Sequence, residues 1–276
     1  FPEEPRQYDS SYDNSIVRIG VRDEWMRVLD NDYYVGNFRW TGFDYLGESF
    51  GWPARTANFG IIDLAGIPKD HYYLYQSLWS NKPMVHLLPH WTHPGKEGTE
   101  IPAVAYSNAD SVELFLNGTS LGTKKIDPRE ETVWMVPYAQ GELRAVACID
   151  GIVVAEQRVR TAGAPSQIAL QPSRLEMRAN RTDVTKVDIE ICDKHAVCVP
   201  LADNQVELEV HGPGRLIGVE NGDILDLAPN KGHNRRAFRG KLVAFVQSTN
   251  QVGAIRFVAR SKGLKTQTIA IQVTPL

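Results

Sequence analysis

The stretch YYVGNFRWTGFDYLGE, residues 33–48, decides how the first part of the chain is interpreted. Its apolar beginning predicts a strand over residues 33–40, which ends at Trp40 and opens into a glycine-punctuated loop with Asp44 and Glu48. An aromatic ring and carboxylates at a strand end are typical of the mouth of an α/β barrel that binds sugars. The stretch therefore favours a carbohydrate-binding site.

The flanking residues predict helices on both sides of this strand. Apolar side chains recur at helical spacing over residues 21–29, and residues 68–79 predict a helix with Pro68 in its first turn. The loop between strand and second helix, residues 41–67, holds five glycines and is too long for a simple connection. Helix, strand, long loop and helix match one and a half units of a (β/α)8 barrel, so residues 1–82 are predicted to be the end of such a barrel.

The rest of the sequence alternates in the manner of β-strands. In VELFLNG, residues 112–118, apolar side chains share one face and Asn117-Gly118 predicts a tight hairpin turn. The small residues of TAGAP, 161–165, suit a linker. We expect one β-sandwich over residues 83–163 and a second over residues 164–276.

The composition excludes two classes of partner. With a net charge of −3 over 276 residues, the chain has no basic field for a polyanion, which excludes nucleic acid. No apolar run approaches the roughly 20 residues of a membrane-spanning helix. The chain starts at Phe1, with no Met and no apolar targeting segment, so we expect its natural start to lie further upstream.

Two of the three cysteines, Cys192 and Cys198, flank a short segment that predicts a hairpin turn. Two interpretations stay open, because thiols that face each other across strands can close a disulfide, whereas half-buried strands also carry free thiols. His195 lies between them, but two cysteines and one histidine fall short of the four ligands of a closed zinc site. Pro89 interrupts the histidines of residues 86–93, which are therefore expected to make structural contacts and not to bind a metal ion. No cofactor is predicted either.

Four motifs in a fixed order carry a family resemblance: WTGFDYLGE, then WPARTANFGIIDLAGIPKDHYYLYQSLW, then VHLLPHW, then VELFLNGTSLGTKK. Together they resemble the C-terminal part of glycoside hydrolase family 2 enzymes of the β-galactosidase type. The last module, with GPGRLIGVENGD, resembles the immunoglobulin-like domain that closes many such enzymes. The resemblance covers almost the whole chain and implies the last units of a (β/α)8 barrel followed by two immunoglobulin-like sandwiches.

The resemblance also implies where the chemistry lies. Enzymes of this family are retaining and use one Glu as acid and base and a second Glu as nucleophile, with carboxyl groups ~5 Å apart. Both are expected upstream of residue 1. We therefore predict no catalytic residue in this chain, and we predict that the chain alone is inactive.

The substrate-binding residues predicted in this chain are Trp40, Asp44, Glu48 and Trp52. The resemblance implies that Trp40 floors the subsite of the cleaved sugar with its apolar face. A Trp buried in the core is the alternative. Asp44 and Glu48 are expected to hold the loop or to bind sugar hydroxyls, and Trp52 is expected to line the same pocket or to fix the loop.

The sequence as a whole favours the C-terminal portion of a retaining exo-β-glycosidase, with β-galactosidase as the expected activity on terminal β-galactosides of oligo- or polysaccharides. The alternative is a non-catalytic module that binds carbohydrate or acts as a scaffold, although such a module has no need of a barrel's last unit. The expected partners are the carbohydrate substrate and the remainder of the catalytic barrel, and the sequence is compatible with a homo-oligomer. The family's habit implies a periplasmic or secreted location in a bacterium.

Overall fold

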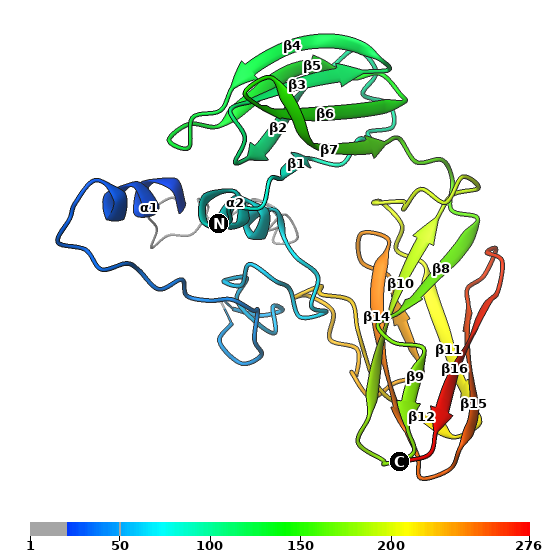
Figure 1. Ribbon diagram of the computed structural model, residues 1–276. Coiled ribbons are helices and arrows are strands. Elements are labelled where there is room, and N and C mark those ends of the chain that lie inside the picture. Colours follow the sequence, from blue (N-terminus) through cyan, green and yellow to red (C-terminus); the bar gives the residue numbers. More distant parts are fainter. Residues whose placement is uncertain (1–20, 50) are drawn as a thin grey trace. The chain divides into compact units, whose positions relative to one another are not determined.

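The computed structural model describes residues 21–49 and 51–276, which form two compact units that divide between Thr161 and Ala162 (Figure 1). The described helices and two small sheets belong to the first unit. The second unit is built from one sheet of four strands and one of five, whereas the sheets of the first unit have three and four. The finer division of the chain into three domains stays a prediction.

The helices predicted on either side of the long loop are confirmed. They are α1 (Val21–Leu29) and α2 (Asp70–Trp79), and neither is long and apolar enough to cross a membrane. Their apolar faces meet the edge of the neighbouring sheet in a small core, which includes Val21, Leu74, Tyr75, Leu88 and Tyr106.

The strand predicted over residues 33–40 is wrong. This segment has no strand in the structure, and the side chains of Val35 and Phe38 are fully exposed. A strand is stable when its backbone N–H and C=O groups pair with a neighbour. Among residues 21–49 and 51–276, no strand lies beside this segment to pair with it. The described residues therefore show no (β/α)8 barrel.

An antiparallel sandwich follows α2, as predicted. One sheet has the order β1-β2-β5, with β1 (Val85–Leu88), β2 (Glu100–Ser107) and β5 (Thr132–Pro137). The other has the order β4-β3-β6-β7, with β3 (Ser111–Leu116), β4 (Thr119–Lys125), β6 (Glu142–Ile149) and β7 (Ile152–Arg160). The inner faces of both sheets share one apolar core, which includes Trp91, Val112, Leu114, Trp134 and Leu143.

The hairpin turn predicted at Asn117-Gly118 is confirmed. Both residues have positive φ, 52° and 83°, which a two-residue type I′ turn requires. Strands β3 and β4 pair antiparallel on either side of the turn, with Leu116 opposite Thr119. Asn-Gly therefore sets the register of this edge of the sandwich.

His86 has the structural role expected for it. Its Nε2 lies 2.9 Å from Asp70 Oδ1 at the start of α2, and its ring stacks on Tyr73 with ring centres 3.8 Å apart. His86 itself belongs to β1. The histidine thus attaches the second helix to the first sheet.

The second unit is also a β-sandwich with a core of its own, and its strands pair antiparallel apart from one parallel pair at the edge of its second sheet. Its first sheet has the order β12-β14-β10-β8, with β8 (Gln167–Pro172), β10 (Val184–Cys192), β12 (Gly214–Glu220) and β14 (Lys241–Ser248). Its second sheet has the order β13-β11-β15-β16-β9, with β9 (Glu176–Arg178), β11 (Gln205–His211), β13 (Asn234–Arg236), β15 (Gly253–Arg260) and β16 (Gln267–Thr274).

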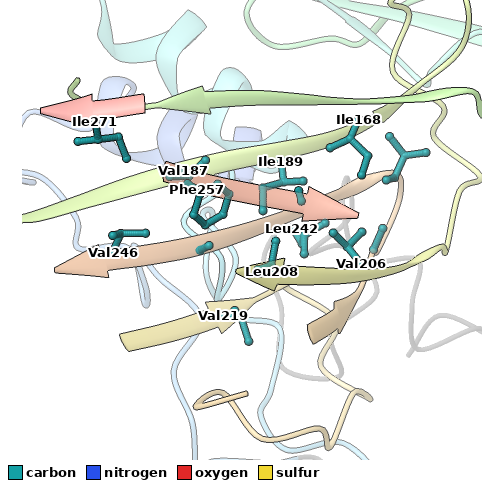
Figure 2. Packing of buried hydrophobic residues seen from close by; sticks show 14 of the residues in the cluster. Ile168, Val187, Ile189, Val206, Leu208, Val219, Leu242, Val246, Phe257 and Ile271 are labelled. Carbon is teal, nitrogen blue, oxygen red and sulfur yellow. The ribbon is translucent and has the colours of Figure 1, made fainter. Parts of the chain in front are cut away.

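Figure 2 shows how alternate side chains of the two sheets fill this second core. Along β10, Val187 and Ile189 are buried while the residues between them are less so, which is the period of two expected for a strand with one face in the core. They meet side chains of the opposite sheet such as Leu208 and Phe257. The alternation read from the sequence is confirmed here.

Candidate functional site

The long loop after Trp40 folds back on itself. Its two legs, residues 41–44 and 59–62, lie side by side and are joined by backbone hydrogen bonds, among them one from the Asp44 N–H to the Ile62 carbonyl at 2.9 Å. At Gly60 a Cβ would overlap the backbone of the opposite leg. The two legs approach this closely because the residue at that point is glycine.

The buried side chain of Asp44 anchors the loop. Its carboxylate lies 2.7 Å from Lys69 Nζ and accepts the Gly60 N–H at 2.7 Å, and both charged side chains are almost fully buried. Burial raises the pKa of Asp44 and lowers that of Lys69, because each charged form loses its water, while their mutual attraction opposes both shifts. Leaving one charge of such a pair buried without its partner costs about 3–5 kcal/mol. The pair therefore ties the loop to the residue just before α2.

Trp40 lies on the surface of the same loop. Its side chain is 67 % exposed, so Trp40 belongs to no core formed by residues 21–49 and 51–276. Its Nε1 donates to the Tyr45 hydroxyl at 3.2 Å, and the two rings meet edge to face. The Tyr45 hydroxyl in turn donates to Glu48 Oε2, and this hydrogen bond raises the pKa of the phenol. These two hydrogen bonds fix the direction of the Trp40 ring and leave its face open.

Trp52 lies at the far end of the loop with 85 % of its side chain exposed. The turn beneath it is closed by the Ala54 N–H, which donates to the Gly51 carbonyl at 3.0 Å. Ser49 adds a second link, because its hydroxyl donates to the Ala54 carbonyl and accepts the Gly51 N–H at 3.0 Å. The loop tip thus presents a second aromatic ring on a turn held by its own hydrogen bonds.

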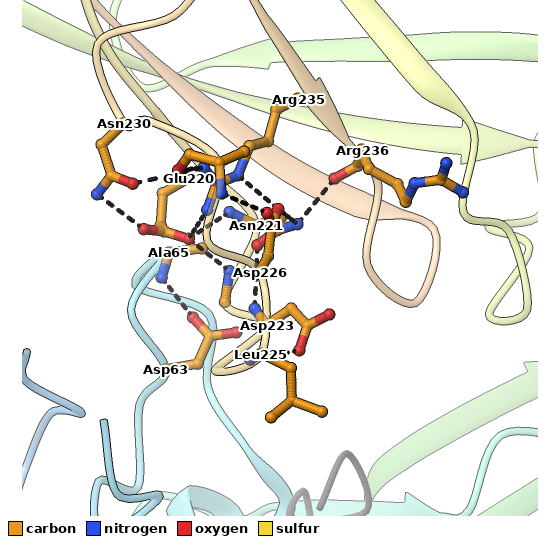
Figure 3. A network of polar contacts seen from close by, with 12 residues as sticks. Asp63, Ala65, Glu220, Asn221, Asp223, Leu225, Asp226, Asn230, Arg235 and Arg236 are labelled. Atoms are coloured by element: carbon orange, nitrogen blue, oxygen red, sulfur yellow. Dashed lines mark hydrogen bonds and ion pairs between the residues drawn. The ribbon is translucent and has the colours of Figure 1, made fainter. Parts of the chain in front are cut away.

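A second turn, ahead of α2, is organised by Asp63. Its Oδ1 accepts the N–H groups of Ala65 and Ile67, both at 2.8 Å, and the bond to Ala65 is drawn in Figure 3. Burial raises the pKa of this carboxyl to about 6. Burial likewise lowers the pKa of His71 in α2 to about 3, so that imidazole is neutral at physiological pH.

The second unit holds a buried polar network of its own, also shown in Figure 3. The fully buried guanidinium of Arg235 binds Glu220 at 3.1 Å and Asp226 at 3.0 Å. It also donates to the Ala228 carbonyl at 2.6 Å. Because Glu220 ends β12 and Arg235 belongs to β13, this network fixes the loop between those two strands.

Sequence reasoning missed Tyr45, Gly60 and Lys69, which position the loop. Asp63 carries a recognisable signal, because Asp before a glycine-containing turn often accepts backbone N–H groups two residues ahead. Lys69 carries none, since it reaches Asp44 across 25 positions of sequence. The substrate contacts predicted for Trp40, Asp44, Glu48 and Trp52 stay predictions.

The described part of the chain offers no evident metal site. Within residues 21–49 and 51–276, no group of three His, Cys, Asp or Glu side chains could hold an ion. His90 and His93 stack on each other with ring centres 4.7 Å apart, and burial lowers the pKa of His90 to about 4. This histidine pair therefore contributes packing.

Two family profiles match the chain. Residues 168–270 match the profile described as glycoside hydrolase family 2 C-terminal domain 5. Residues 98–155 match a profile described as a domain of unknown function, DUF4982. Each match falls within one of the two sandwiches.

Relatives cover the chain from end to end. The β-galactosidase BoGH2A of Bacteroides ovatus is 41 % identical over 97 % of this chain and 32 % of its own length. A relative from Formosa agariphila, also 41 % identical, carries a provisional β-glucuronidase name and matches 88 % of this chain and 24 % of its own length. The crystal structure of a β-glycosidase from Bacteroides vulgatus is 45 % identical and superposes with a TM-score of 0.92 over 95 % of this chain and 34 % of its own. The chain thus spans about a quarter to a third of the length of these three proteins.

Proposed function

The chain belongs to glycoside hydrolase family 2, as the C-terminal part of such an enzyme, and we propose that it completes a retaining exo-β-glycosidase that removes terminal β-galactosides from oligo- or polysaccharides. The main support for the proposal is the exposed ring of Trp40. Tyr45 and Glu48 orient this ring through hydrogen bonds, and a buried ion pair anchors its loop. The apolar face of such a ring complements the C–H face of a pyranose.

We further propose that both catalytic carboxylates belong to the part of the enzyme that precedes this chain. A retaining mechanism needs two carboxyl groups ~5 Å apart on either side of the glycosidic bond. Asp44 is buried against Lys69, and Glu48 accepts the Tyr45 hydroxyl on the same loop. Neither arrangement suits an acid and a nucleophile that approach one bond from opposite sides.

A galactoside suits the charge around Trp40 better than a glucuronide does. Glu48 is exposed and linked to Trp40 through Tyr45, so the negative charge lies beside the ring. A glucuronide carries a carboxylate of its own, which the like charge of Glu48 would repel. A neutral sugar avoids this repulsion, and one of its hydroxyl groups can instead donate a hydrogen bond to Glu48.

We also propose that residues 1–82 are the last units of a (β/α)8 barrel. Apolar side chains between residues 33 and 52 are exposed in an unusual number for one short segment of a soluble protein. A barrel built by the preceding part of the enzyme would cover those that do not face the substrate. The exposed side chains are Tyr33, Tyr34, Val35, Phe38, Trp40, Phe43, Leu46 and Trp52.

The test compares this chain with a longer polypeptide that adds the natural sequence upstream of Phe1. We expect the longer polypeptide to hydrolyse a chromogenic β-galactoside faster than the matching β-glucuronide, and the 276-residue chain to hydrolyse neither. In the longer polypeptide, Trp40→Ala should lower kcat/KM by about 100-fold or more, because a stacking surface for the reacting sugar is lost. Trp40→Phe, which keeps an aromatic face, serves as the matched control and should recover part of the loss.

The outcomes separate the competing functions. Faster turnover of the glucuronide would overturn the substrate assignment and leave the glycosidase in place. Full activity of the short chain would contradict the position of the catalytic carboxylates. Tight binding of a galactoside by the short chain, with no activity in the longer one, would favour the non-catalytic module.

We propose a periplasmic or secreted location for the enzyme, on the ground of what is usual in its family. Fractionation of the source cells tests this. Activity confined to the cytosolic fraction would contradict it.

A further inference from the structure

Cys192 and Cys198 lie directly opposite each other across a short antiparallel ladder. Backbone hydrogen bonds bracket the pair, one joining residues 191 and 199 at 2.8 Å and the other joining residues 193 and 197 at 2.9 Å. Because the bonds fall on the neighbours, the cysteines form a non-hydrogen-bonded pair. In such a pair the Cα atoms are about 4.5 Å apart and the side chains leave the ladder on the same face. Disulfides join residues whose Cα atoms are about 4.4–6.8 Å apart.

The turn between the two cysteines fixes this register. Oδ1 of Asp193 accepts the N–H of His195 at 2.8 Å and the N–H of Val197 at 3.0 Å. Ala196 has a φ of 62°, which lets the chain reverse direction within the turn. A slip of one residue would break both hydrogen bonds to Asp193 and turn one thiol to the other face of the ladder.

We propose that Cys192 and Cys198 form a cross-strand disulfide when the chain folds in an oxidising compartment. The two thiols give up two protons and two electrons as the S–S bond forms. A small-molecule or protein disulfide accepts them through thiol–disulfide exchange and is released as two thiols. The structure has both cysteines as free thiols, which is the reduced state of this pair.

Burial restricts when the bond can form. It raises the pKa of the Cys192 thiol to about 11 and that of Cys198 to about 12, and the negative charge of Glu190 adds to both shifts. The thiolate is the reacting species in exchange, so the folded, reduced pair reacts slowly at neutral pH. The disulfide is therefore made while the chain folds and both sulfurs can still be reached.

Cys148 serves as an internal control. It lies in β6 opposite Ser111 of β3 and Val153 of β7, so neither neighbouring strand places a cysteine across from it. The pairing is thus specific to the turn in the second unit.

The test is to refold the 276-residue chain in glutathione buffer with the oxidised form in excess, block free thiols and digest with trypsin without reductant. Cleavage after Lys194 separates the two cysteines onto residues 187–194 and 195–215. We expect these two peptides to remain linked until reductant is added. Cys148→Ser should keep the linkage, whereas Cys198→Ser should lose it and leave Cys192 blocked as a free thiol.

Recovery of the two peptides as separate, blocked thiols after oxidative refolding would overturn the proposal, as would a linkage between chains. A second measurement follows the melting of the refolded chain. Closing a seven-residue loop should raise the melting temperature of the second unit by about 5–10 °C relative to the reduced chain. Reductant should have no such effect on the Cys198→Ser variant, and an equal shift there would also overturn the proposal.

Discussion

Asp63 makes the stability of the first unit depend on pH. Burial raises its pKa from 3.8 to about 6. Between these values the folded chain keeps a proton that the unfolded chain has released, so the free energy of unfolding falls as pH rises through the window. Each pKa unit is worth about 1.4 kcal/mol, so this residue alone removes about 2–3 kcal/mol between about pH 4 and pH 7.

Asp63→Asn isolates this effect. The amide keeps an oxygen that can accept the N–H groups of Ala65 and Ile67 but carries no titrating proton. Urea unfolding at a series of fixed pH values should show the variant gaining stability relative to the parent chain as pH rises, by the amount given above. Parallel curves for the two chains would show that Asp63 does not titrate in this window.

Single residues differ in how far the sequence reveals their roles. Trp40 was expected at the end of an apolar segment with its ring facing a sugar, and its ring is exposed, whereas the sugar contact stays a prediction. Tyr45 could not be assigned, since its link between Trp40 and Glu48 depends on how the loop folds. Asp44 was expected to hold the loop or to bind sugar. The structure shows that it holds the loop, through its ion pair with Lys69.

The loop of residues 41–67 behaves as an element because its two legs pair. Gly60→Ala would force a methyl group into the opposite leg, whose backbone cannot rotate away. The backbone N–H groups of Asp44 and Ile62 each donate a hydrogen bond to the opposite leg. We expect both amides to lose protection from hydrogen exchange. In the longer polypeptide the same change should lower activity through Trp40.

Gly42→Ala is the matched control for this loop. Gly42 lies on the opposite leg, residues 41–44, and a Cβ there would meet no atom within 4 Å. Its exchange pattern should therefore match that of the parent chain. If both alanine variants, or neither, lost protection, the close approach at Gly60 would not be what holds the legs together.

Elements that stabilise themselves were predictable, and those that need a distant partner were not. The sandwich strands show alternation such as Val187 and Ile189 facing one core, and Asn117-Gly118 allows one turn type. The segment 33–40 has the composition of a strand but no neighbour among the described residues, so its backbone has nothing to pair with. Composition records a tendency to form a strand, whereas pairing decides whether one forms.

The two units differ in how much apolar surface they can bury by themselves. The core of the second unit lies entirely within residues 162–276 and draws on both of its sheets. The first unit also has a core between its sheets, but the segment from 33 to 52 contributes almost nothing to it. A polypeptide of residues 162–276 should therefore fold and remain monomeric.

The 276-residue chain, by contrast, should self-associate and bind a hydrophobic dye, because exposed apolar side chains gain about 25 cal/mol per Å² when they leave water. Sedimentation and dye fluorescence measure both effects at equal molar concentration. Val35→Asp and Phe38→Asp alter side chains that are fully exposed, so they should weaken association and leave the melting of both units unchanged. A parent chain that is monomeric and does not bind the dye would contradict the barrel proposal. It would show that this apolar segment is not a surface that a missing part of the enzyme covers.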